Sequence, residues 1–120
     1  MNKRELGARY EQQAAAYLQE QGLRIVTRNF RCRIGEIDLI AAERQEDREV
    51  LVFVEVKYRT SPSAGGGPLY AVNRKKQLTI MRAAEWYLMK NGLPETTPCR
   101  FDVVGITPEG VEHIRNAFWL

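Results

Sequence analysis

The chain has 120 residues, of which 44% are hydrophobic, so length and composition predict one folded domain over residues 1–120 and argue against global disorder. Eighteen Lys and Arg against fifteen Asp and Glu give a net charge of +3, which suits a nucleic-acid partner without requiring one. No apolar run is long enough to span a membrane, and the polar N-terminus is unlike a secretory signal. We therefore expect a cytoplasmic protein.

The few cysteines and histidines argue against several kinds of chemistry. Cys32 and Cys99 lie far apart, and His113 is the only histidine, so the spacing does not match a structural zinc site. A Ser-His-Asp or Cys-His mechanism would depend on His113, which lies in a charged, strand-like segment near the C-terminus. The glycines at 65–67 are not followed by a Lys-Ser or Lys-Thr pair, so they do not form a P-loop.

The first half of the chain predicts one helix followed by three strands. Apolar residues at helical spacing indicate an amphipathic helix over residues 3–21, ended by Gly22. Alternating and β-branched segments predict a polar hairpin turn at 43–48 between the second and third strands. The three strands are expected at residues 23–30, 34–42 and 49–58.

The second half predicts a loop, a helix and one or two strands. Residues 60–68 combine Ser, Gly and Pro without periodicity and are expected to form a mobile loop. A second helix is expected over 71–91, and Trp86 and Tyr87 on it are expected to be core residues. A strand follows at 100–106, with a weaker edge strand at 111–118. The predicted class is α/β, with a central mixed β-sheet flanked by helices in the order α-β-β-β-α-β-(β).

The third predicted strand is apolar on both faces and still carries two charged residues. Glu55 and Lys57 share one face with Leu51 and Phe53, so the strand is expected to be central and buried on both sides. A lone buried carboxylate costs on the order of several kcal/mol unless it is paired or bound to a metal. A Glu55–Lys57 ion pair is the simplest structural interpretation.

The second predicted strand adds carboxylates to this patch. Alternation places Ile37 and Leu39 on one face and Glu36 and Asp38 on the other. If this strand pairs antiparallel with the third through the predicted turn, Asp38 lies near Glu55. Carboxylates crowded in this way repel one another unless a divalent cation neutralises them, which favours a site for Mg²⁺ or Mn²⁺.

Such a patch suits hydrolysis of a phosphodiester bond. A bound metal would lower the pKa of a water molecule and withdraw charge from the phosphoryl oxygens. Lys57 would orient or deprotonate that water and stabilise the developing negative charge. This chemistry requires no histidine.

Asp38, followed on the next strand by Glu55-Val56-Lys57, resembles the PD-(D/E)xK signature of the restriction-endonuclease-like superfamily, with Ile37 in place of the proline. The chain is more closely similar to the YraN family of small bacterial proteins, which are predicted nucleases similar to archaeal-type Holliday-junction resolvases. The resemblance implies a restriction-endonuclease-like core. Its segments are an early helix carrying Glu11, then Arg28–Arg31, Gly35–Ile40, Phe53–Arg59 and Arg100–Val104.

The resemblance also implies roles for individual residues. Asp38, Glu55 and the Val56 backbone carbonyl would be metal ligands, with Lys57 as the water-activating residue. Glu11 would complete the site, unless it is a solvated glutamate on the polar face of its helix. The remaining candidates are Glu36, as a ligand or as the salt-bridge partner of an arginine; Gln77, as a polar residue that approaches the site; and Arg31, Arg33, Arg59, Arg74, Lys75 and Lys76, as phosphate contacts.

Three functions follow as hypotheses, in order of preference. The first is a Mg²⁺-dependent endonuclease acting on DNA, including branched or junction DNA, for which the resemblance adds a homodimer as an expected assembly. The second is a catalytically weak or inactive nucleic-acid-binding module of nuclease fold. The third is a small adaptor or dimerising domain whose Glu–Lys pair is structural, which leaves the placement of Asp38 and Glu36 unexplained.

Overall fold

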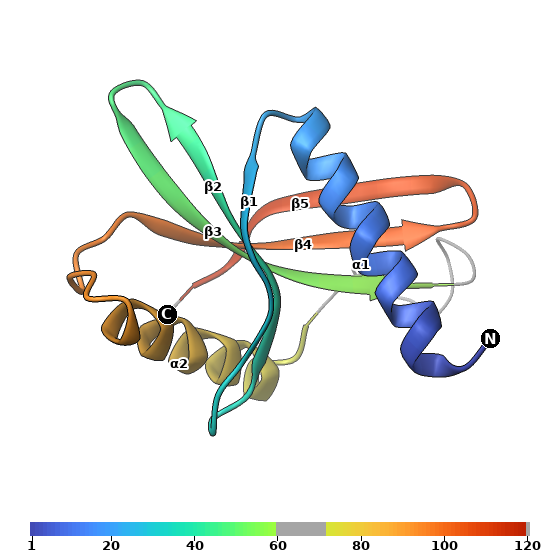
Figure 1. The fold of residues 1–120 in the computed structure, drawn as a ribbon, viewed down its shortest axis with the longest axis horizontal. Coiled ribbons are helices and arrows are strands. Elements are labelled where there is room, and N and C mark those ends of the chain that lie inside the picture. The colour runs from blue at the N-terminus through green and yellow to red at the C-terminus, as the bar shows by residue number, and fades with distance from the viewer. Residues whose placement is uncertain (60–71, 120) are drawn as a thin grey trace.

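The computed structural model describes residues 1–59 and 72–119 of the chain (Figure 1). Within these residues the order of elements is helix, three strands, helix, two strands, which confirms the predicted α/β class and element order. The predicted loop at 60–68 lies outside the described residues. The elements are α1 (Lys3–Glu20), β1 (Arg24–Arg31), β2 (Glu36–Gln45), β3 (Arg48–Tyr58), α2 (Arg74–Lys90), β4 (Cys99–Thr107) and β5 (Gly110–Phe118).

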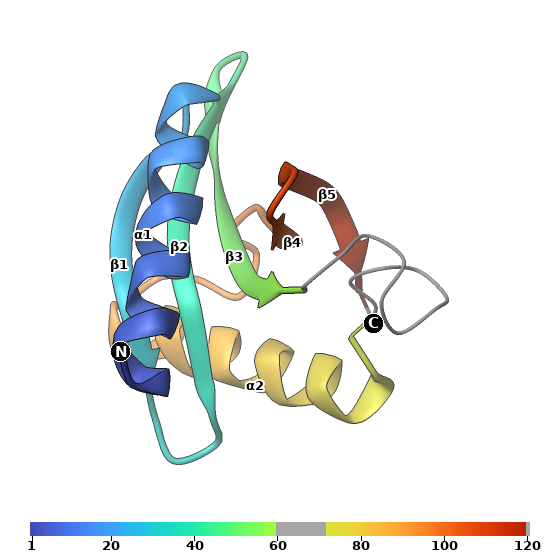
Figure 2. The same ribbon diagram turned by 90° about the vertical axis from the view of Figure 1, so that its right-hand side faces the viewer.

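The strands form one five-stranded sheet in the order β1-β2-β3-β4-β5. β3 and β4 run parallel, while the other neighbouring pairs run antiparallel. Parallel neighbours need a crossover connection, and the chain between β3 and β4 supplies one that contains α2. The two helices lie on opposite faces of the sheet (Figure 2). β3 is therefore central and covered on both faces, and β5 is an edge strand, as predicted.

Each helix begins at an asparagine whose side chain accepts a hydrogen bond from a backbone N–H of the first turn. Asn2 accepts from Glu5, and Asn73 accepts from Lys76, so α2 begins at Arg74 and not near residue 71. The turn between β2 and β3 is also shorter than predicted, because both strands extend until Glu46 and Asp47 alone connect them. Neither described helix combines the length and apolarity needed to cross a membrane.

The sheet separates two apolar clusters. The cluster that involves α2 contains, among others, Ile40, Phe53, Ile80, Tyr87 and Val103. The cluster that involves α1 contains, among others, Leu18, Leu39, Val52, Val54 and Ile106. Because β3 contributes to both, its sequence is nearly continuously apolar. Tyr87 is a core residue as predicted, whereas the same prediction for Trp86 is wrong, since its position on the helix leaves it 40% exposed.

The turn between β1 and β2 packs closely against α2 at Gly35. A Cβ atom at this position would lie 2.6 Å from the Cγ2 methyl of Thr79. Thr79 is stiff because it is β-branched and because its hydroxyl donates to the Lys75 carbonyl. Glycine therefore lets this turn approach the helix that carries part of the candidate site.

Candidate active site

The charged residues of β3 lie at its C-terminal end. The Glu55 side chain is on the same face as Phe53, toward α2, and the residue is only 8% exposed. The Nζ atom of Lys57 lies 3.9 Å from Oε1 of Glu55, and the Lys57 side chain is 35% exposed. The alternation predicted for these residues is confirmed. Glu55 is thus a buried carboxylate with one partly exposed ammonium beside it.

Asp38 lies in the gap where β2 and β3 separate. The paired residues of these strands end at Leu39 and Val54, and beyond them Oδ2 of Asp38 accepts a hydrogen bond from the Val56 backbone N–H at 2.8 Å. The side chain replaces the strand partner that Val56 would otherwise have. In an extended strand the N–H and C=O of one residue point to the same side, so the Val56 carbonyl faces the same gap. The carboxylates of Asp38 and Glu55 and the backbone carbonyl of Val56 therefore lie close together.

The expectation that Ile37 and Leu39 share a face is wrong. Ile37 packs in the α2 cluster and Leu39 in the α1 cluster, although the two residues are only two apart in β2. The register places Asn29 of β1 opposite Asp38, and Asn29 has a φ of 53°. A left-handed residue inside a strand reverses the alternation, and both strands change faces there together. Asp38 consequently points into the strand gap.

The negative charges of the two carboxylates at the site are only partly compensated by nearby positive groups. Burial, and after it the nearby Asp38 carboxylate, raise the pKa of Glu55 to about 7, despite the opposing effect of Lys76 and Lys57. Burial also raises the pKa of Asp38 above its usual value, against the Val56 hydrogen bond and the same two lysines. The two carboxylates therefore lack full compensation by the protein, which is the signature expected of a functional site.

Glu11 of α1 belongs to the surroundings of this pair. Its side chain is half-buried, and its pKa is raised mainly by burial and then by the Asp38 carboxylate. A hydrogen bond from the Asn29 side chain opposes that rise. The helix thus brings Glu11 near enough to Asp38 for the two carboxylates to interact, while its part in a metal site stays a prediction. In the described part of the chain, no three carboxylate, imidazole or thiol groups are close enough to hold a metal ion together.

The donor set nevertheless fits Mg²⁺. This ion prefers oxygen ligands, keeps several waters, and is usually held through one or two carboxylates. Asp38 and Glu55 supply two carboxylates, and the Val56 carbonyl supplies a third oxygen on the same side. A cation there would offset both the burial and the repulsion from Asp38 that raise the pKa of Glu55.

The other predicted residues divide into those at the site and those apart from it. Lys76 acts electrostatically on both carboxylates, so it belongs to the site. Glu36 also acts electrostatically on both carboxylates, raising their pKa values, and forms an exposed ion pair with Arg31 at 3.3 Å, which matches the salt-bridge alternative. Gln77 is occupied at the start of α2, where its amide donates to the Val72 carbonyl and accepts from Arg74. Arg33 and Lys75 are exposed, and Arg59 is half-buried just after β3.

A second polar cluster, which sequence reasoning missed, lies where β4 and β5 meet α1. We call it the paired cluster, and its members are Tyr17, Glu43, Arg100, Asp102, His113 and Arg115. Asp102 is fully buried and accepts hydrogen bonds from Arg100, from the Asn116 backbone N–H and, at 2.7 Å, pairs with Nε2 of His113. The signal was available, since Asp102 interrupts an apolar strand just as Glu55 does.

The paired cluster has the opposite electrostatics. Hydrogen bonds from Arg100 and, to a lesser degree, Arg115 lower the pKa of Glu43 to about 2. Burial alone would raise the pKa of Asp102, but its bonds with His113 and Arg100 hold it below the usual value. These carboxylates are fully compensated, so the cluster reads as structural.

Comparison with known proteins identifies relatives along the whole chain. Residues 10–106 match the model of the "Uncharacterised protein family UPF0102". A UPF0102 protein of Lachnoclostridium phytofermentans is 51% identical over 118 residues, covering 98% of this chain and 96% of the relative. One of Nitrosococcus oceani is 46% identical, covering 98% and 89%. Since both the family model and these full-length relatives match, the chain belongs to the UPF0102 family.

Proposed function

We propose that the chain is a Mg²⁺-dependent endonuclease that hydrolyses phosphodiester bonds in DNA. The observation that carries the proposal is the pair of incompletely compensated carboxylates, Asp38 and Glu55, beside Lys57 at the end of β3. The resemblance of these residues to the PD-(D/E)xK signature and to the YraN family supports the same activity, with the cytoplasm as the expected location.

Asp38, Glu55 and the Val56 carbonyl would hold Mg²⁺, or Mn²⁺ in its place. When bound, the ion would lower the pKa of a coordinated water and neutralise charge on the phosphoryl oxygens. Nζ of Lys57 lies 3.9 Å from Oε1 of Glu55, close enough for an ion pair, and the ammonium group would orient the attacking water. Glu11 approaches from α1 and would support the ion through its waters.

The basic side chains around this end of the sheet would bind the DNA backbone. Lys76 already acts on the two carboxylates and would contact the phosphate nearest the cleaved bond. Arg33 and Lys75 are exposed and would contact phosphates further away, with Arg31, Arg59 and Arg74. Such contacts make affinity fall steeply with salt and carry little sequence preference. Branched and junction DNA are therefore included among the substrates to test.

A second candidate is a nucleic-acid-binding module of the same fold with weak or no catalysis. Two observations favour it. Asp38 already accepts a hydrogen bond from Val56, and within the described residues no three ligand groups converge on one point. Both candidates require the basic surface, so cleavage is what distinguishes them.

The deciding experiment is a cleavage panel of single-stranded, duplex, flapped and four-way-junction DNA with Mg²⁺, Mn²⁺ or EDTA. Lys57→Ala and Asp38→Asn should abolish cleavage and leave binding to the same DNA intact. Lys90→Ala on the last turn of α2 and Asp47→Asn in the β2–β3 turn are matched controls, since both positions are exposed and outside the site. They should cleave like the unmodified protein.

Two results would contradict the endonuclease. If neither metal supports cleavage while the chain still binds DNA at low salt, the binding module is correct. If calorimetry detects no metal binding and DNA binding is absent too, the Glu55–Lys57 pair is structural.

A further inference from the structure

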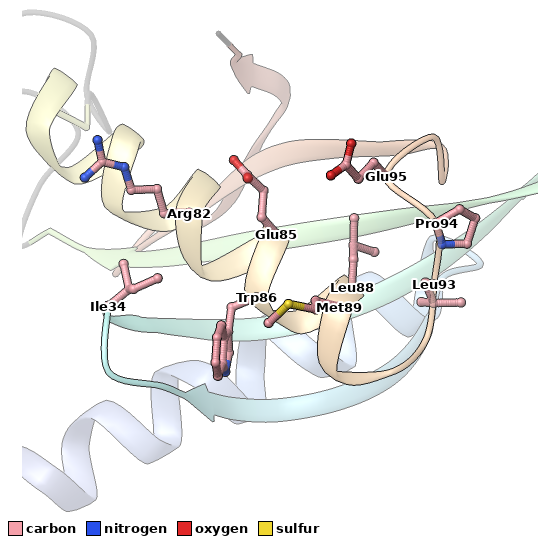
Figure 3. A pocket seen from close by; sticks show the side chains of 9 residues that line it. All are labelled: Ile34, Arg82, Glu85, Trp86, Leu88, Met89, Leu93, Pro94 and Glu95. Atoms are coloured by element: carbon pink, nitrogen blue, oxygen red, sulfur yellow. The ribbon is translucent and has the colours of Figure 1, made fainter.

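A hollow of about 830 Å³ lies beside the C-terminal half of α2, away from the first turn that carries Lys76 and Gln77 (Figure 3). Its apolar lining comes from three parts of the fold. Ile34 belongs to the β1–β2 turn, Trp86 and Met89 to α2, and Leu93 to the segment that follows α2. We call these four side chains, with the hollow they surround, the α2 groove.

The apolar residues of the α2 groove are unusually exposed for their size. Ile34 is 44% exposed, Trp86 40%, Met89 61% and Leu93 37%. Single exposed apolar residues are common, but four gathered around one hollow indicate an interaction surface. They are not needed to attach α2 to the sheet, because Ile80, Tyr87 and other residues of the same helix do that.

Side chains of opposite charge lie at the two ends of the α2 groove. Arg82 lies at one end and Glu95 at the other, with Glu85 on the rim between them (Figure 3). Two carboxylates beside a single arginine do not suit a DNA backbone. A two-fold axis that runs across the groove, perpendicular to the line from Arg82 to Glu95, would bring Arg82 of one copy opposite Glu95 of the other, twice.

We propose that the α2 groove joins two copies of this chain in a symmetric dimer. The same surface offers both parts that a self-complementary interface needs, since Trp86 and Met89 are exposed side chains and the hollow beside them can receive their counterparts. Trp86 is the anchor, because large aromatic side chains dominate the energetics of interfaces. Lys76, the α2 residue that acts on the candidate active site, lies on the first turn of the helix, at the opposite end from Leu93.

The test is a charge exchange across the proposed two-fold axis, followed by sedimentation equilibrium over a range of protein concentrations. Arg82→Glu alone and Glu95→Arg alone each create two like-charge contacts, so each should raise the dimer Kd about tenfold or more. The double variant Arg82→Glu/Glu95→Arg restores opposite charges and should return the Kd to within about threefold of the unmodified value. Trp86→Ala should leave a monomer.

Two exposed charges elsewhere provide the matched controls. Glu20→Arg at the end of α1 and Arg48→Glu at the start of β3 are charge reversals outside the α2 groove, and should leave the Kd unchanged. Circular dichroism and thermal unfolding of every variant would show that the fold is retained. A chain that stays monomeric at all concentrations overturns the proposal. So does a dimer whose Kd responds equally to the controls, or whose double variant is no tighter than the single ones.

Discussion

Two pairs of carboxylates lie in the same sheet, one at the candidate active site and one in the paired cluster. Their pKa values are shifted in opposite directions. Glu55 is buried with its pKa raised to about 7, while Glu43 in the paired cluster has its pKa lowered to about 2. Asp38 and Asp102 differ in the same sense. Burial alone therefore does not mark a functional carboxylate. What marks it is the number of cationic and hydrogen-bonding partners. A carboxylate with few such partners can bind a cation, whereas the carboxylates of the paired cluster are already neutralised by protein side chains.

The largest expected contrast is between activity and stability at Asp38. Asp38→Asn should lower the rate of metal-dependent DNA cleavage at least about a hundredfold, because a metal ligand is lost. The asparagine oxygen can still accept from the Val56 N–H, so the melting temperature should not fall. Cleavage assays and thermal unfolding of the same preparation measure both. Retained cleavage would remove Asp38 from the catalytic residues.

Asp102 should behave in the reverse way. Asp102→Ala leaves Arg100 and His113 without their buried partner, and breaking such a pair costs about 3–5 kcal/mol of unfolding free energy. Urea unfolding measures this loss. A decrease below about 1 kcal/mol would show that the paired cluster contributes little to stability, and the contrast with Asp38 would then lose its meaning.

The pH dependence of stability should differ between Glu55 and Glu43 in metal-free protein. The folded-state pKa of Glu55 lies above the ordinary 4.5, so its stabilising contribution is present below pH 4.5 and is lost as the pH rises to about 7. Glu55→Gln should therefore exceed the unmodified protein in stability at pH 8, by up to about 3 kcal/mol. Denaturation in EDTA at several pH values tests this.

Glu43 is the internal control for that measurement. Its folded-state pKa is lowered, so its contribution is present above pH 4.5 and is lost as the pH falls toward about 2. Glu43→Gln should be less stable than the unmodified protein at pH 7, and the difference should shrink in acid. Parallel pH profiles for the two variants would contradict the distinction between the clusters.

The smallest effect is expected at Asn29, which links Glu11 to the site. Asn29→Gly permits the left-handed backbone and removes the side-chain bond to Glu11, so Mg²⁺ affinity should fall about tenfold with little change in stability. Asn29→Ala should additionally lose about 1 kcal/mol, because alanine is strained at a φ of 53°. Calorimetric titration and urea unfolding separate the two effects. Unchanged affinity in both variants would show that the Asn29–Glu11 hydrogen bond does not support metal binding.

Alternation and the cost of buried charge were sufficient to predict where Glu55 and Lys57 lie in the sheet. Both lie on the expected face of a strand that is central as predicted, because a nearly continuous apolar strand must be covered on both sides. The same alternation failed at Ile37 and Leu39. The left-handed conformation of Asn29 reverses the faces of its own strand and of its neighbour. The alternation of residues in β2 gives no information about the backbone conformation of β1.

In the paired cluster the sequence marked Asp102 as a charged residue in an apolar strand, but the partners of Asp102 could not be predicted, for a different reason. Glu43, Asp102 and His113 meet only because β4 runs parallel to β3 and β5 folds back on β4, and the alternation within a single strand does not report these pairings. The exposure of Trp86 has a similar origin. Its neighbour Tyr87 faces the sheet, and the helix rotation that decides between them depends on packing across the whole α2 face.

The two-residue turn between β2 and β3 has a consequence for the order of folding. Residues close in sequence can pair early, because little chain entropy is lost in bringing them together, and Asp38 and Glu55 lie on one hairpin. Asp102 is placed only after α2 has formed and β4 has docked beside β3. We therefore expect the nascent chain to bring the mutually repelling carboxylates Asp38 and Glu55 together first. The ion pairs of the paired cluster should form last.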